Sequence, residues 1–164
     1  MTLRLVRVDD RLIHGQVIAV WLRALGAEVI VVVDDATAQD DFLREVIELA
    51  APEGVEVEVH GVADGAQAVK ELAASDIATF VLVKSPQVAL QLVEAGAPID
   101  VLNVGGMGAA AGRTPLYKNI SASPEELEAM RELERRGARV ELRIVADDSP
   151  TPFSSVDKKS EVHS

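Results

Sequence analysis

The sequence predicts a single α/β domain in which a mostly parallel central β-sheet carries helices on both faces. Three observations lead to this prediction: strand-like apolar runs alternate with helical patterns, one run is apolar throughout, and only 3% of the residues are aromatic. With 164 residues, of which 48% are hydrophobic, the chain can build a full core mostly from Val, Leu, Ile and Ala. Strands that are joined by helices pair in parallel, which gives this fold class.

The first half of the chain alternates strictly between the two patterns. The predicted elements are, in order, strand 3–8, helix 15–25, strand 29–35, helix 40–51, strand 55–59 and helix 66–74. Gly26 ends the first of these helices. The run VIVVVDD (29–35) is of the kind that is buried on both faces of a parallel sheet.

The second half repeats the alternation and then changes character. Its predicted elements are strand 79–84, helix 86–96, strand 100–104, a short segment 119–121, helix 123–137 and strand 139–145. In the last helix Ser123 is the N-cap, Pro124 occupies the first position and Gly137 ends it. From about Asp147 the sequence becomes polar and rich in Pro and Ser. We therefore expect a domain over residues 1–148 and, over 149–164, a flexible C-terminal tail or a cut linker.

Composition excludes several classes of function. The chain has no cysteine, which rules out disulfides, thiolate metal sites and a cysteine nucleophile and favours a reducing cytosol. Its three histidines are scattered, so we expect no metal centre. A formal charge of -11 argues against general binding of nucleic acid. No apolar run is long enough to span a bilayer, and we expect a soluble protein.

The segment RVDDRLIHGQV lies where a ligand would bind in such a fold, between the first strand and the first helix. His14 precedes the free N–H groups of a helix start, where an anion is favoured. Gly15 leaves room for an incoming group, Arg11 can bind phosphoryl oxygens, and Asp9 or Asp10 could hold one imidazole nitrogen. The alternative is an ordinary helix start with surface ion pairs. Position and composition alone leave both interpretations open.

A second glycine-rich segment, NVGGMGAAAGRT, follows the strand at 100–104. Its glycine spacing partly matches a dinucleotide fingerprint, so a nucleotide-binding domain that uses Gly105 to Gly112 is one alternative. That motif needs a helix directly after the glycines, and Arg113, Thr114 and Pro115 interrupt it. We favour a glycine-rich wall against the His14 loop, with Arg113 or Thr114 adding anion contacts.

Together these segments resemble one protein family. RVDDRLIHGQV is similar to the active-site loop of the IIB component of the mannose/fructose/sorbose class of the bacterial phosphoenolpyruvate-dependent sugar phosphotransferase system (PTS). The likeness covers about residues 1–148 and continues, in order, through Trp21, AAPEGV, KSP, LNVGGM, GRT and RGARVELRIV. The loop and the NVGGM segment are each fairly specific.

The resemblance implies a phosphocarrier, a component of a protein-N(π)-phosphohistidine–sugar phosphotransferase. In that scheme the phosphohistidine of a IIA protein donates to His14, which passes the phosphoryl group to a sugar bound by a IIC/IID membrane permease. Arg11 matches the arginine of the family's loop. On this resemblance we expect that no cofactor or metal is required and that IIA comes from another chain. We also expect the protein to be cytoplasmic and peripherally associated with the permease.

For the site itself we hypothesise further roles. Asp10 fixes the imidazole, Gly15 and Gln16 lend backbone donors, and Ser85 closes one side of the phosphate pocket. The sequence does not reveal the sugar or the oligomeric state, and a homo-oligomer is compatible with it. One alternative of a different kind stays open: a IIB-like regulatory phosphocarrier that signals to a protein partner without transport.

Overall fold

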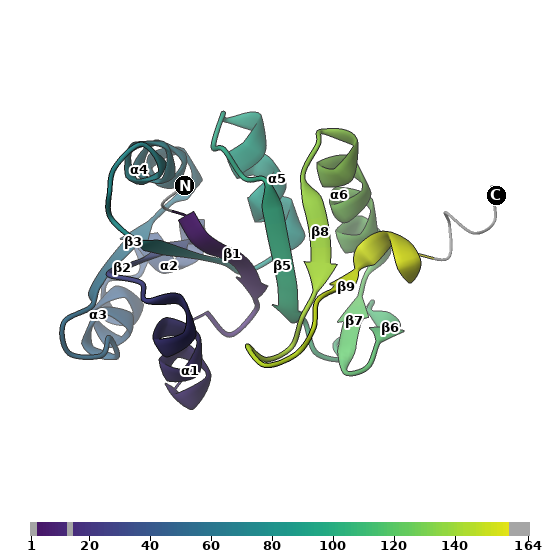
Figure 1. Cartoon of the computed structure of the whole chain (residues 1–164), viewed down its shortest axis with the longest axis horizontal. Coiled ribbons are helices and arrows are strands. Elements are labelled where there is room, and N and C mark those ends of the chain that lie inside the picture. Colours follow the sequence, from purple (N-terminus) through teal and green to yellow (C-terminus); the bar gives the residue numbers. More distant parts are fainter. Residues whose placement is uncertain (1–2, 13–14, 158–164) are drawn as a thin grey trace.

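The computed structural model describes residues 3–12 and 15–157, with only the backbone for 15–18. Its centre is a seven-stranded sheet (Figure 1). In spatial order the strands are β3 (Glu56–His60), β2 (Val29–Val33), β4 (Thr79–Val83), β1 (Leu3–Asp9), β5 (Val101–Gly106), β8 (Arg139–Leu142) and β9 (Thr151–Pro152). All neighbouring strands pair in parallel except β8 and β9. The predicted fold class is confirmed.

Helices follow the strands in alternation. They are α1 (Gly15–Leu25), α2 (Asp35–Gln39), α3 (Asp41–Leu49), α4 (Val62–Ala73), α5 (Pro86–Glu94) and α6 (Pro124–Arg135). A separate antiparallel hairpin, β6 (Thr114–Tyr117) and β7 (Ile120–Ala122), lies between β5 and α6. Among residues 3–12 and 15–157 no helix is long and apolar enough to cross a membrane.

The helix predicted over 40–51 is α3, which covers 41–49, and a short helix that the sequence did not predict, α2, precedes it over 35–39. The Asp34 carboxylate accepts the backbone N–H of Thr37 at 3.1 Å and caps α2. Asp40 then accepts the N–H of Leu43 at 3.1 Å and caps α3. An aspartate in extended backbone geometry satisfies the free donors of a new helix start, so the Asp40 cap explains why α3 begins directly after α2.

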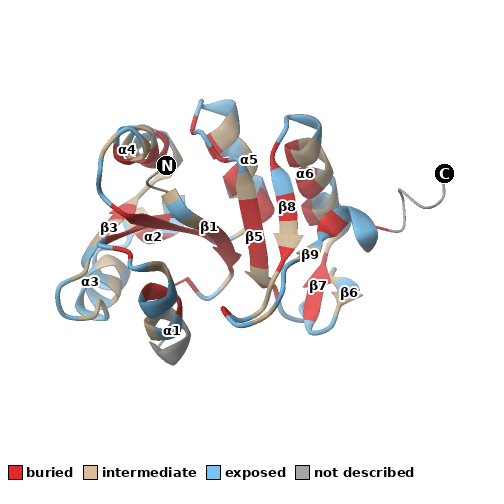
Figure 2. Ribbon diagram, viewed as in Figure 1, coloured by how far each residue is buried: buried red, intermediate tan, exposed pale blue. Residues whose placement is uncertain are grey.

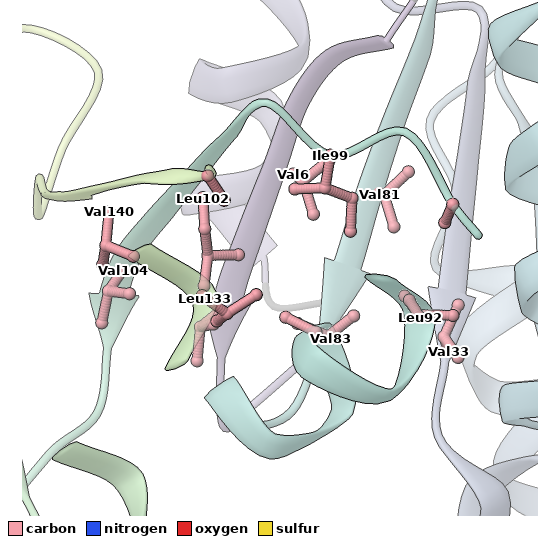
Figure 3. Packing of buried hydrophobic residues seen from close by; sticks show 14 of the residues in the cluster. Val6, Val33, Val81, Val83, Leu92, Ile99, Leu102, Val104, Leu133 and Val140 are labelled. Carbon is pink, nitrogen blue, oxygen red and sulfur yellow. The ribbon is translucent and has the colours of Figure 1, made fainter. Parts of the chain in front are cut away.

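Two hydrophobic clusters cover the two faces of the sheet. The larger one joins the sheet to α4, α5 and α6, and Figure 3 shows Leu92 of α5 and Leu133 of α6 near valines of the strands. The smaller one joins the sheet to α1, α2 and α3 through residues such as Trp21 and Ile47. All five residues of β2 are buried between these clusters, as the apolar run predicted (Figure 2).

The prediction of a flexible tail from residue 149 is wrong for residues 151–157. Strand β9 pairs antiparallel with β8, and a short 3₁₀ helix, η1 (Phe153–Ser155), follows it. Phe153 is fully buried in the larger cluster, and Asp157 accepts two hydrogen bonds of 2.8 Å from Arg131 of α6. One buried aromatic ring and one charged pair outweigh the polar composition of this stretch. Residues 158–164 lie outside the described part of the chain.

We expect Phe153→Ala to lower the free energy of unfolding by about 3–5 kcal/mol, because it leaves a cavity in the core where the last strand is anchored. Urea unfolding followed by circular dichroism measures this change. The neighbouring exposed Ser154 provides the control, since Ser154→Ala should stay within about 0.5 kcal/mol of the parent. Equal stability of the Phe153 variant and the parent would contradict the assignment of this segment to the domain.

Candidate active site

The site is built at the carboxyl edge of the sheet, where β1 and β4 lie side by side. After β1 the chain enters α1 on the face of the smaller cluster, whereas after β4 it enters α5 on the opposite face. Neighbouring strands whose helices leave to opposite faces form a crevice, which is the usual ligand position in α/β sheets. His14 belongs to the connection that follows β1, but it lies outside the described residues.

The chain leaves β1 through a tight turn. The backbone N–H of Leu12 donates to the carbonyl of Asp9 at 3.0 Å. Leu12 has a φ of 56°, in the left-handed region that non-glycine residues rarely occupy. Its side chain is 6% exposed and packs into the smaller cluster, which holds this backbone conformation in place. Strained backbone of this kind gathers at functional sites.

The buried carboxylate of Asp9 holds the turn through hydrogen bonds to Arg11. Its side chain is 4% exposed, and Oδ1 accepts the backbone N–H of Arg11 at 3.1 Å and the Arg11 Nε–H at 3.3 Å. The Arg11 side chain is 52% exposed, and its two terminal nitrogens donate to no other described residue. The backbone and Nε of Arg11 are therefore fixed, whereas its two terminal guanidinium nitrogens are available to bind phosphoryl oxygens.

Arg7 lies beneath Asp9 and is almost completely buried, with 1% of its surface exposed. Its guanidinium donates to Oδ1 of Asn103 at 2.5 Å and to the carbonyls of Arg143 and Ile144 at 2.6 and 2.8 Å. Its Nε lies 3.9 Å from Oδ2 of Asp9.

The Arg7 guanidinium also lies 4.6 Å from the centroid of the Trp21 ring, a cation–π contact. Burial lowers the pKa of Arg7 to about 10 against the opposing effect of Asp9, so the group stays charged at neutral pH. Arg7 thus links β1, β5, α1 and the segment after β8 under the catalytic edge.

The glycines of the second motif make room for these two side chains. A Cβ atom on Gly105 would lie 2.2 Å from a terminal nitrogen of Arg7 and 2.3 Å from the carbonyl oxygen of Arg143. A Cβ on Gly106 would lie 2.3 Å from Cγ of Asp9. This packing explains the glycines without a nucleotide and supports the wall that the sequence predicted.

A second ion-pair cluster fixes Asp10. Arg113 donates to Oδ2 of Asp10 at 2.9 Å, to the carbonyl of Gly108 at 2.9 Å, and to both carboxylate oxygens of Glu126 at 2.9 and 2.8 Å. Glu126 also completes the capping box of α6 with Ser123. Burial alone would raise the pKa of Glu126, but the hydrogen bonds from Arg113 and Ser123 hold this pKa below its ordinary value.

A hollow of about 340 Å³ lies over this network. It is lined by Asp10, Arg11, Gly105, Gly106, Met107, Gly108, Asn119, Ile144 and Val145. Three of these lining residues are glycines, and one is the exposed Arg11. A small anion that enters it meets one guanidinium whose terminal N–H groups carry no bond to the described part of the chain.

The predicted site residues divide into three groups. Asp10 and Arg11 line the hollow, and Arg113 contacts its lining residues Asp10 and Gly108 while most of its donors are engaged by them and by Glu126. Ser85 follows β4 and caps α5 by accepting the N–H of Val88 at 3.3 Å. Thr114 begins β6 and lines a separate hollow beside α6. Gly15 and Gln16 begin α1, and their side chains are not described.

Sequence reasoning missed the supporting residues Arg7, Asn103 and Glu126. The sequence could have indicated a structural role for Arg7, because a charged residue between two valines in a buried strand needs buried hydrogen-bond partners. The partners themselves lie about 100 residues or more away, so no local pattern could identify them.

Comparison with known proteins decides the family. The sequence model described as "PTS system sorbose subfamily IIB component" matches residues 3–164. The chain belongs to this family. It is 36% identical over 148 residues to the sorbose-specific EIIB component of Klebsiella pneumoniae, which covers 90% of each chain. The crystal structure of the IIBSor domain of the sorbose permease from that organism superposes with a TM-score of 0.89, at 33% identity and 98% coverage of both chains.

The family membership confirms the resemblance and the activity it implied. IIB components are phosphotransferases that carry a phosphoryl group during sugar uptake, together with a IIA component and a permease. The mannose-specific EIIAB component of Escherichia coli K12 is 34% identical over 90% of this chain, which spans 46% of that protein. Neither alternative from the sequence, signalling without transport or nucleotide binding, is favoured by these relatives.

Gly105→Ala should destabilise the IIB domain by at least about 2 kcal/mol, because the new methyl group collides with the Arg7 guanidinium and with backbone. Gly108 offers a matched control: its Cβ would meet no atom within 4 Å, so Gly108→Ala should change stability by no more than about 0.5 kcal/mol. Urea unfolding of the three proteins measures the difference. Similar values for the two variants would show that Arg7 does not require the glycine.

The Arg113–Glu126 pair makes a prediction about pH. A carboxylate whose pKa is lowered by folding adds stability above its unfolded pKa of about 4.3 and loses it as the pH falls through the folded value. At pH 7 we expect Glu126→Gln to cost about 1.5–3 kcal/mol. The gap between variant and parent should narrow below about pH 4. Glu125→Gln, the same change at an exposed neighbour, should have little effect, whereas a pH-independent gap for Glu126 would refute the charge argument.

Proposed function

We propose that His14 is the phosphoryl acceptor and donor of this IIB component, and that Arg11 stabilises the transferred group. The observation that carries the proposal is Arg11 itself: buried Asp9 accepts from its backbone N–H and its Nε, while the exposed Arg11 side chain lines an open hollow. His14 follows this turn by two residues and directly precedes α1. Phosphoryl transfer depends mainly on such positioning and on positive charge around the equatorial oxygens.

The remaining residues supply orientation and hydrogen bonds. Oδ2 of Asp10 is held by Arg113, and Oδ1 accepts no hydrogen bond from the described residues, so Oδ1 can fix one nitrogen of the imidazole. The backbone N–H groups of Gly15 and Gln16 begin α1 and serve the phosphoryl oxygens. Ser85 bounds the pocket from the adjacent strand β4. Arg113 and Thr114 contribute to phosphate binding mainly through the loop that they shape.

The reaction consists of two transfers. In the first, the P–N bond of a IIA phosphohistidine breaks and a P–N bond to His14 forms. In the second, the hydroxyl oxygen of a sugar attacks the phosphorus, the P–N bond to His14 breaks, and the hydroxyl proton balances the charge on the imidazole that is released. No redox step and no further group is involved. The carrier works in the cytoplasm at a IIC/IID permease, which binds the sugar, and sorbose or mannose, named for its relatives, are among the sugars to test.

The decisive experiment is the transfer reaction itself. The parent and His14→Ala are incubated with phosphoenolpyruvate, enzyme I, the histidine phosphocarrier and a mannose-class IIA domain, and intact mass and peptide analysis follow the label. We expect an acid-labile phosphoryl group on His14 of the parent and none on the variant. An unlabelled parent, with each donor shown to be phosphorylated, would overturn the assignment.

Arg11→Ala in the same assay tests the second role. The maximal rate of transfer should fall by about two orders of magnitude or more, because a preorganised positive donor at the transition state is lost. The exposed Arg4 lies at the start of β1 and provides the matched control. Transfer by Arg11→Ala at the parental rate would exclude this arginine from the chemistry.

A further inference from the structure

Helix α3 exposes an apolar stripe that consists of Phe42, Leu43, Val46 and Leu49. The exposed fractions of Phe42 and Leu49 are 73% and 78%, and those of Leu43 and Val46 are 42% and 47%. No residue of α3 is buried, and Figure 2 shows the helix without any buried segment. Single exposed apolar residues are common, but four in one helix of nine residues form a contiguous patch that marks an interaction site.

The core does not account for this stripe. Phe42, Val46 and Leu49 are spaced by four and three residues and so share one face of the helix. The helix is attached to the domain by a different residue, Ile47, which packs against the smaller cluster. Consequently the apolar face of α3 points away from the sheet and has no cover within the described part of the chain.

The stripe starts at the same edge of the sheet as the active site. Helix α3 follows β2 and α2 at the carboxyl edge, and it leads back to β3 at the opposite edge. It shares a sheet face with α1, the helix that follows the His14 turn, because both contribute to the smaller cluster. Val20 of α1 is also 46% exposed. A protein that binds at the connection between β1 and α1, on the sheet face that carries α1 and α3, would contact the stripe.

The charges around the stripe indicate what binds there. Asp41, Glu45 and Glu48 are exposed residues of the same helix, and its single basic residue, Arg44, is half-buried, so the exposed charge beside the stripe is acidic. The whole chain carries a formal charge of -11. A second copy of the chain would place like charges opposite each other, and anionic lipid headgroups would be repelled in the same way. A soluble protein with an apolar centre bordered by Lys and Arg is complementary.

We propose that the α3 stripe is the docking surface for the phosphoryl donor, a IIA domain whose contact surface is apolar at its centre and basic at its rim. The inference rests on the proposed function of His14. The donor is favoured over the permease because the permease lies among lipids, where the acidic rim is repelled.

The test measures the initial rate of transfer to His14 as a function of the concentration of phosphorylated mannose-class IIA domain. We expect the double variant Phe42→Ala/Leu49→Ala to raise the apparent KM for this donor about tenfold or more, since removal of central apolar contacts weakens an interface. The maximal rate should stay at the parental value, because neither residue belongs to the site. Ile77, 39% exposed and outside α3, supplies the control Ile77→Ala, which should leave KM unchanged.

Charge reversal gives a second, independent measurement. The double variant Glu45→Lys/Glu48→Lys should lower the initial rate of phosphoryl transfer at limiting donor concentration, because the acidic rim no longer attracts the basic donor. The rate should also depend less on salt concentration than in the parent. Neither carboxylate contacts the core, and urea unfolding verifies that the variants fold as the parent does.

The possible outcomes separate the proposals. An unchanged KM in the double variant overturns the docking assignment while a labelled His14 leaves the proposed function intact. An unchanged KM together with slower transfer to permease-containing vesicles would assign the stripe to the permease, and a dimer that dissociates in the variant would assign it to a second copy. A parent that accepts no phosphoryl group from any phosphorylated donor overturns both proposals.

Discussion

The buried guanidinium of Arg7 is the interaction on which the rest of the site depends. A charged group with 1% exposure is tolerated only where hydrogen bonds satisfy it, and here Asn103 and two backbone carbonyls accept from it. These acceptors come from β5 and from the segment after β8. One side chain of the first strand therefore ties together β5 and the segment after β8, both of which contribute residues to the lining of the hollow.

Two features of the site follow from this constraint. The backbone of β5 must approach Arg7 and Asp9 so closely that only glycine is accepted at positions 105 and 106. Asp9, held from below, then anchors the backbone and the Nε of Arg11. The terminal nitrogens of Arg11 remain available because the fixing contacts use only its backbone and Nε. Arg7 and Asp9 thus provide the rigid support, and the terminal nitrogens of Arg11 provide the binding group.

The alternating fold and the position of the turn after β1 could be predicted from local sequence patterns, whereas their long-range supports could not. The all-buried β2 and the capped helix α6 follow from apolar runs, Ser123 and Gly137, which act within a few residues. The role of Arg7 and the contact of Arg113 with Asp10 depend on partners about 100 residues distant. The polar composition after residue 148 misled the prediction of a tail, because the burial of Phe153 and the pairing of Asp157 with Arg131 anchor that segment.

The balance of charge around the hollow is consistent with a group that must be accepted and then released. Three guanidinium groups, of Arg7, Arg11 and Arg113, are matched by three carboxylates, of Asp9, Asp10 and Glu126. Arg113 is largely neutralised by its two partners, so a phosphoryl group meets mainly the one exposed arginine. A site with several unpaired cations would bind the phosphoryl group too strongly in the ground state and slow the second transfer. The arrangement therefore favours rapid release of the phosphoryl group to the acceptor over tight binding of that group.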